Sequence, residues 1–213
     1  IVEREMERFF VTGIGTGIGK TFISAILAKA LDADYWKPVQ AGYENGTDSE
    51  WIKSILKNST VYPEMYKLQL AASPHIAARE EGVRISLQKI TENIPSKNRN
   101  LIIEGPGGLM VPLNEREFVT DLIKVLNVKV ILVSRNYLGS INHSLMTSEL
   151  CKQKDIPVIG WVFNDQYLSY EQEIISWSGV PGIGSVPFCE DINELFVEKQ
   201  ADLFRERLAA FYD

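Results

Sequence analysis

The chain has 213 residues, with 22 lysines and arginines against 28 aspartates and glutamates, so its formal net charge is −6. This acidic balance lacks the positive excess with which proteins bind a phosphate backbone, so we expect no nucleic-acid partner. No apolar run approaches the roughly 20 residues that a membrane-spanning helix needs. Cys151 and Cys189 stand apart, without the spacing of a metal site. We therefore expect a soluble cytoplasmic protein, in which residues 1–5 are an added, processed or disordered segment before a natural start at Met6.

Short apolar, β-branched runs alternate with helical patterns along the chain, which is typical of a parallel sheet covered by helices. Pro38 must end the strand at 34–36, because proline has no N–H for a neighbouring strand. Ser73 and Pro74 predict a capped helix start. In chain order we expect strand 8–12, helix 21–31, strand 34–36, helix 48–56, helix 74–82, strands 101–104 and 130–133, helix 141–154, strand 158–163, helix 169–178, strand 183–186 and helix 193–211. The pattern predicts one α/β domain over residues 1–213, with a mostly parallel central sheet and helices on both faces.

The most informative local pattern is the glycine-rich segment 13–21, which lies between a predicted strand and a predicted helix. Its backbone N–H groups suit phosphate, Lys20 can reach the terminal phosphates, and the Thr21 hydroxyl is placed to bind Mg²⁺. The loop is one residue longer than the ordinary Walker A motif, which favours a branch of the P-loop NTPases with a three-layer fold. A plain glycine turn or a dinucleotide site would not need Lys-Thr at the helix start. We assign nucleotide binding to Gly13, Gly15, Gly17, Ile18, Gly19, Lys20, Thr21 and Phe22.

Two charged residues follow predicted strands, at the sheet edge where open α/β proteins bind ligands. Lys37 would place a second cation beside the phosphates, although a solvated loop lysine is an equal alternative from the residue alone. Glu104 ends a buried strand, where a carboxylate is costly unless it meets a cation or a metal. Asp48 is a further candidate carboxylate, but its position at a helix start favours an N-cap role.

Three further positions lie at predicted strand or helix ends. Ser140, in the segment 139–143, can cap a helix and so form a site for a carboxylate. Asn164 follows a strand, where its amide can bind a nucleotide base or simply form a turn. His75 and His143 are each more typical of structural histidines than of catalysts.

Together these segments resemble the dethiobiotin synthetase family, over about residues 8–188. The ordered series of motifs, rather than any one of them, is specific. The motifs are Phe10 to Thr21, Lys37-Pro38-Val39, Thr47-Asp48, Ser73-Pro74-His75, Glu104 to Gly108, Leu138 to His143, Gly160-Trp161-Val162 with Asn164-Asp165, and Val186-Pro187. The longer phosphate loop is shared with the family.

The resemblance implies an ATP- and Mg²⁺-dependent cyclo-ligase of biotin biosynthesis, acting on 7,8-diaminononanoate and CO₂. One amine captures CO₂ as a carbamate, ATP phosphorylates the carbamate, and the second amine closes a cyclic urea. It also implies a homodimer, because the segment 139–142 acts on the substrate of the other subunit. The implied catalytic residues are Lys37, Lys20 and Thr16; the implied metal ligands are Thr21, Asp48 and Glu104. The implied substrate-binding residues are Lys37, Ala41, Gly139, Ser140, Ile141 and Asn142, and Glu104, Gly107, Asn164 and Pro187 join the nucleotide site.

Several positions depart from the family pattern. Gly17 stands where members often carry Glu, Ala41 where a hydroxyl residue can contact substrate, and Tyr137 where a lysine occurs. The segment after Pro187 matches poorly, so a looser nucleotide preference than ATP alone is a hypothesis. The competing functions are a P-loop switch ATPase acting on a protein partner and a related amide-forming or cyclo-ligase.

Overall fold

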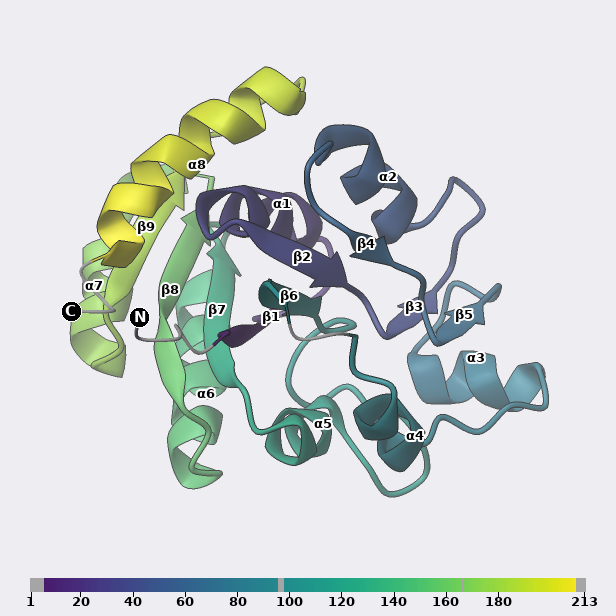
Figure 1. The fold of residues 1–213 in the computed structure, drawn as a ribbon. Helices are drawn as coiled ribbons and strands as arrows, with labels where there is room; N and C mark the ends of the chain where they lie inside the picture. Colours follow the sequence, from purple (N-terminus) through teal and green to yellow (C-terminus); the bar gives the residue numbers. More distant parts are fainter. Residues whose placement is uncertain (1–5, 96–97, 166, 210–213) are drawn as a thin grey trace.

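A seven-stranded parallel sheet is the centre of the computed structural model, which describes residues 6–95, 98–165 and 167–209. Its strands lie in the order β4–β2–β6–β1–β7–β8–β9, and every neighbouring pair is parallel (Figure 1). The strands are β1 (Arg8–Gly13), β2 (Ala33–Trp36), β4 (Val61–Tyr62), β6 (Asn100–Glu104), β7 (Lys129–Arg135), β8 (Val158–Asn164) and β9 (Gly182–Val186). This sheet confirms the predicted α/β fold class. The expectations for residues 1–5 and 210–211 lie outside the described residues.

Helices cover both faces of the sheet because its strands are apolar on both sides. Alternate residues of β1 divide between two cores: Phe9 and Val11 pack on one face, and Phe10 on the other. The first face carries α1 (Lys20–Ala30), α2 (Asp48–Ile55) and α8 (Glu194–Ala209). The second carries α4 (Leu87–Glu92), α5 (Val119–Leu126), α6 (Ser140–Gln153) and α7 (Glu171–Ser178) (Figure 1). None of the described helices is long and apolar enough to cross a bilayer.

Beside the main sheet lies a small element that the sequence did not predict. Strand β3 (Val39–Ala41) begins directly after Pro38 and pairs in parallel with β5 (Tyr66–Leu68). Pro38 does end β2 as expected, but the chain resumes an extended path one residue later. Helix α3 (Pro74–Glu80) follows. Ser73 is its N-cap residue, yet the predicted side-chain cap is wrong, because the Ser73 hydroxyl bonds to His75 Nδ1 at 3.0 Å instead.

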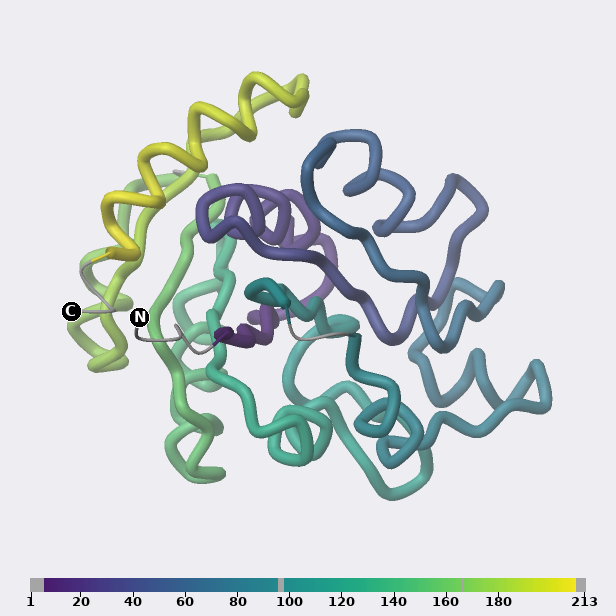
Figure 2. The backbone as a smooth tube through the Cα atoms, viewed as in Figure 1, coloured from purple at the N-terminus to yellow at the C-terminus, as the bar shows by residue number. Residues whose placement is uncertain are grey.

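The parallel arrangement brings the carboxyl ends of distant strands to one edge. Val11 of β1 pairs with Glu104 of β6, and Gly13 of β1 pairs with Val133 of β7. In Figure 2 the purple start of the chain accordingly runs beside teal segments that are about 90 to 120 residues away in the sequence. The carboxyl ends of β1, β6 and β7 therefore meet around the loop that follows β1.

Candidate functional site

The glycine-rich loop joins β1 to α1 and is anchored at both ends. At its start the Ile14 N–H donates to the Val133 carbonyl of β7 at 3.1 Å. At its end the Asn164 amide of β8 donates to the Ile18 carbonyl at 2.8 Å. Gly19 lies at φ +90°, and a side chain there would overlap both Asn164 and the Phe22 ring. The loop shape therefore requires glycine at its last position, as expected of a backbone that curls around phosphate.

Lys20 is the first residue of α1 and is almost fully buried. Its Nζ donates to the Gly15 carbonyl at 2.6 Å, so the side chain folds back along the loop. Burial lowers the pKa of Lys20 to about 8, and the nearby Lys37 also lowers it, while Glu104 and Asp48 act in the opposite direction. An anion bound in the loop would offset this cost of burying a cation.

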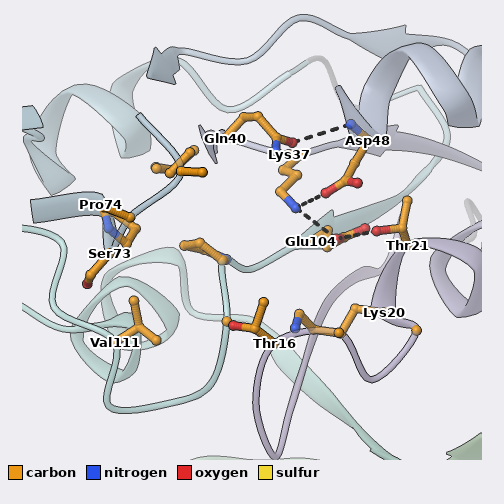
Figure 3. A pocket seen from close by; sticks show the side chains of 18 residues that line it. Thr16, Lys20, Thr21, Lys37, Gln40, Asp48, Ser73, Pro74, Glu104 and Val111 are labelled. Atoms are coloured by element: carbon orange, nitrogen blue, oxygen red, sulfur yellow. Dashed lines mark hydrogen bonds and ion pairs between the residues drawn. The ribbon is translucent and has the colours of Figure 1, made fainter. Parts of the chain in front are cut away.

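Lys37, Asp48 and Glu104 form a cluster, called here the carboxylate–lysine cluster. Lys37 Nζ donates to Glu104 Oε1 at 3.0 Å and forms a short ion pair with Asp48 Oδ2 (Figure 3). The Lys37 and Glu104 side chains are 8% and 1% exposed, so neither charge is solvated. Burial lowers the pKa of Lys37, but the two carboxylates outweigh it and the net pKa is raised. Lys37 thus stays a cation, and the solvated-loop alternative is wrong.

Glu104 also receives two hydroxyl donors. Thr21 Oγ1 donates to Glu104 Oε1 at 3.0 Å, and Tyr35 OH donates to Glu104 Oε2 at 2.8 Å. Tyr35 is fully buried, and burial together with the Glu104 charge raises its pKa well above the usual value, so it remains a donor. From the sequence, Tyr35 was predicted only as part of a strand. Its position in the strand that Lys37 follows, two residues before Lys37, is the signal that was available.

Asp48 is free to join the cluster because other residues cap its helix. Thr47 is the N-cap of α2: its hydroxyl accepts from the Glu50 N–H at 3.1 Å, and Glu50 Oε2 accepts from the Thr47 N–H at 2.9 Å. The N-cap role considered for Asp48 is therefore wrong. Gln40 Oε1 holds the Asp48 backbone N–H at 3.3 Å, which leaves the Asp48 carboxylate for Lys37.

The cluster offers oxygen donors of the kind that Mg²⁺ binds. Thr21, Asp48 and Glu104 supply one hydroxyl and two carboxylates around Lys37. No group of three or more His, Cys, Asp or Glu suited to a metal occurs in the described ranges. Such a sparse set fits Mg²⁺, which keeps waters and takes much of its coordination from nucleotide phosphates.

A cavity of about 740 Å³ connects the loop to the cluster (Figure 3). Its polar wall holds Thr16, Lys20 and Thr21 of the loop region together with the carboxylate–lysine cluster. Its other walls are largely apolar. They include Val39, Ala41, Ala71, Ala72, Pro74, Pro106, Gly107 and Val111. The cavity therefore has apolar walls directly beside a strongly charged group of side chains.

A second cavity, of about 160 Å³, lies on the other side of the loop. It brings Asn164 and Pro187 together with Phe22, as expected for a base site. It also contains Arg135 and Phe188, which the sequence analysis did not select. Arg135 ends β7 and pairs in register with Asn164 of β8, which is why the two side chains share this edge.

Comparison with known proteins identifies the family. A family model described as AAA domain matches residues 7–195. A protein from Cytophaga hutchinsonii named ATP-dependent dethiobiotin synthetase BioD is 51% identical over 173 residues, or 80% of this chain and 82% of that protein. A protein of the same name from Christiangramia forsetii is 42% identical, over 94% of this chain and 97% of its own length. The chain belongs to the ATP-dependent dethiobiotin synthetase family.

Solved structures that resemble this synthetase family member share its fold. The MinC:MinD cell division protein complex of Aquifex aeolicus gives a TM-score of 0.60 at 16% identity, covering 96% of each chain. A putative plasmid partition protein of Borrelia burgdorferi bound to AMPPNP also gives 0.60, at 10% identity over 97% of this chain and 99% of its own. These identities are too low to indicate more than a common P-loop ATPase architecture, which confirms the predicted fold.

In this dethiobiotin synthetase family member, the start of α6 lies apart from the main cavity. Gly139, at φ +100°, is the N-cap, and Ser140 is the first helical residue. The predicted Ser140 cap is wrong: its buried hydroxyl bonds to Tyr170 OH at 2.6 Å and accepts from the Tyr137 N–H at 3.3 Å. Ile141 is partly buried and Asn142 is exposed. The structure does not bring segment 139–142 into the wall of the 740 Å³ cavity within one chain.

The two histidines of this synthetase family member lie outside the walls of the 740 Å³ and 160 Å³ cavities. The Ser73 hydroxyl bonds to His75, which borders a separate hollow of about 210 Å³ beside α3. His143 is exposed, and its Nδ1 lies 2.8 Å from Tyr137 OH. Tyr137, which stands where the family has a lysine, thus bonds to His143 in the first turn of α6. Each histidine thus makes one side-chain hydrogen bond to a neighbouring residue.

Proposed function

We propose that the chain acts as one synthetase domain that converts 7,8-diaminononanoate, CO₂ and ATP into dethiobiotin, ADP and phosphate. The nitrogen of one amine bonds to CO₂ and loses a proton, giving a carbamate. A carbamate oxygen then takes the γ-phosphoryl group and ADP leaves. The second amine attacks the carbamate carbon and loses a proton, phosphate leaves, and the urea ring is closed. We place this chemistry in the cytoplasm, where ATP is available.

The observation that carries the proposal is the carboxylate–lysine cluster, which faces the same cavity as the phosphate loop. A carbamate is a small anion. When it takes the γ-phosphoryl group, further negative charge is brought to the same place. Lys37 supplies a buried cation that its two carboxylate partners keep protonated. Phosphoryl transfer depends mainly on positioning and charge neutralisation, so this lysine suits the reacting centre.

The loop supplies the second part of the proposed site. Lys20 and the loop N–H groups hold the triphosphate, and Thr16, on the cavity wall, reaches toward phosphate or substrate. Thr21, Asp48 and Glu104 would hold Mg²⁺, which when bound neutralises charge on the β- and γ-phosphates. Glu104 and Asp48 therefore have two tasks: they accept the metal and keep Lys37 charged.

The apolar walls of the cavity fit the aliphatic chain of the substrate, with Ala41 beside it. Its distant carboxylate would be bound by the N–H groups at the start of α6, from Gly139 to Asn142. Because this segment does not reach the cavity of its own chain, we propose a homodimer in which each subunit completes the site of the other. Leu138, which is 93% exposed beside the segment, is consistent with such a contact.

The base of the nucleotide is assigned to the 160 Å³ cavity, between Asn164 and Pro187. Adenine fits this volume, and the Phe22 and Phe188 rings supply apolar contact. The Asn164 amide already donates to Ile18. We expect ATP to be preferred, with tolerance for other nucleotides decided by this small pocket.

The deciding experiment measures ADP release with Mg·ATP and bicarbonate, in the presence and absence of 7,8-diaminononanoate, with the product identified by mass. Strong dependence on the diamine together with a cyclic-urea product is the expected result. ADP release that ignores the diamine would replace the synthetase reaction with the switch-ATPase or related-ligase alternative. A nucleotide series in the same assay tests the preference for ATP.

A further inference from the structure

Tyr35 gives the proposed metal carboxylate a fixed partner from inside the protein. Its phenol donates to Glu104 Oε2 at 2.8 Å, while Glu104 Oε1 accepts from Thr21 and Lys37, each at 3.0 Å. The two oxygens of one carboxylate thus have different tasks. Oε2 is bound to the core, and Oε1 is bound to groups that line the cavity.

We propose that Tyr35 is a positioning residue for Mg²⁺·nucleotide binding, acting through Glu104. The inference rests on the proposed metal role of Glu104 and adds a residue that is not in the cavity wall. By holding Oε2, the phenol fixes the rotation of the carboxylate so that Oε1 faces the nucleotide. Tyr35 itself touches neither nucleotide nor metal.

The strand register explains why the Tyr35 phenol reaches Glu104. Tyr35 of β2 pairs with Ile102 of β6, so Glu104 is two residues further along on the same side of the sheet. Val11, which pairs with Glu104, belongs to the same core as Tyr35, and this is the side that α1 covers. The phenol, the carboxylate and Thr21 of α1 therefore meet on one face without any loop between them.

Because the contact is buried, the Tyr35 phenol cannot easily be replaced as the donor to Glu104. Tyr35 is fully buried and Glu104 is 1% exposed, so water cannot replace a lost donor. A phenylalanine would fill the same volume and satisfy the apolar packing of this core, but it would leave Oε2 without the donor that the described residues provide. Both oxygens of Glu104 would then accept hydrogen bonds from Thr21 or Lys37, and the carboxylate would be less well oriented to bind the metal.

The matched test compares Tyr35→Phe with Tyr62→Phe. Tyr62 OH donates to Asp34 Oδ2 at 3.3 Å, so the control removes another phenol–carboxylate bond of the same sheet, away from the cavity. Calorimetry measures ADP affinity with and without Mg²⁺ for both variants, for the unchanged protein and for Glu104→Gln. Affinity without Mg²⁺ reports folding and the phosphate loop.

We expect Tyr35→Phe to lose about tenfold of the gain in ADP affinity that Mg²⁺ provides, with the Mg²⁺-free affinity unchanged. Tyr62→Phe should keep the full gain. If Glu104→Gln loses the gain but Tyr35→Phe keeps it within twofold, the positioning role is overturned while the metal role of Glu104 stands. If Glu104→Gln also keeps the gain, the metal role in the proposed function fails, and the role of Tyr35 fails with it. An equal loss in Tyr62→Phe would show a general effect of losing a phenol–carboxylate bond in the sheet and overturn the proposal.

Discussion

Nucleotide binding should be coupled to protonation of Lys20. Burial holds the pKa of this lysine at about 8 in the free protein, below its ordinary value of 10.5. Since one pKa unit corresponds to about 1.4 kcal/mol, keeping Lys20 charged costs the folded protein about 3 kcal/mol. The folded pKa is the lower one, so this cost is fully present below pH 8 and is relieved as the pH rises from 8 toward 10.5. A bound triphosphate beside the ammonium should raise the pKa again.

The size of the coupling follows from these values. In the free protein about nine-tenths of Lys20 is neutral at pH 9, against about one-tenth at pH 7. Binding of ADP or ATP should then take up close to one proton at pH 9 and about 0.1 from this residue at pH 7. The affinity should fall about tenfold over the same interval, because the site must be charged before it binds phosphate.

Calorimetry at pH 9, in two buffers of different ionisation enthalpy, gives the number of protons taken up. Lys20→Arg is the matched variant, because its guanidinium stays charged throughout this range. Its binding should show no proton uptake and little change of affinity between pH 7 and 9. Uptake below about 0.2 proton by the unchanged protein at pH 9, or equal uptake by the arginine variant, would refute the reasoning.

Three further changes test separate parts of the site and fold. Lys37→Ala should lower turnover at least about 100-fold with a much smaller effect on ATP affinity, because Lys37 acts at the reacting centre; an equal loss of nucleotide binding, measured by calorimetry, would place it in the phosphate grip. Gly13→Ala should lower the free energy of unfolding by about 1 to 3 kcal/mol in urea titration, since the added methyl would overlap the Val133 carbonyl oxygen. Thr47→Ala should cost about 1 kcal/mol by removing the N-cap of α2, and a value near zero would contradict the capping box.

The sequence predicted the sheet well because its strands are short apolar runs separated by clear helical patterns. The bounds of β1, α1, β6 and α6 agree with the prediction to within a few residues. Helices α4 and α5 were missed: each is short and lies in a region that carried no recognised motif. Strand β3 was missed because Pro38 was taken as the end of all extended structure there.

The candidate site was predictable where residues follow strand ends in sequence, as Lys37 and Glu104 do. Their shared environment was not, because the bond between them spans 67 residues and depends on the order of strands in the sheet. The role of Asp48 could not be separated from capping until Thr47 was seen to cap α2. Tyr35 was hidden for a physical reason: a buried tyrosine in a strand is ordinary core unless the partner of its hydroxyl is known.

The carboxylate–lysine cluster draws one of its three members from a small outlying helix. Helix α2 has eight residues, of which only Ser49, Ile52 and Ile55 are buried, whereas Lys37 directly follows β2 and Glu104 is the last residue of β6. Short peripheral elements have a lower free energy of local unfolding than the sheet against which they pack. On warming, α2 should therefore unfold first. This would remove Asp48 from the site and abolish turnover while the sheet is still folded. Loss of turnover and loss of the folded-state circular dichroism signal should then occur at two different temperatures.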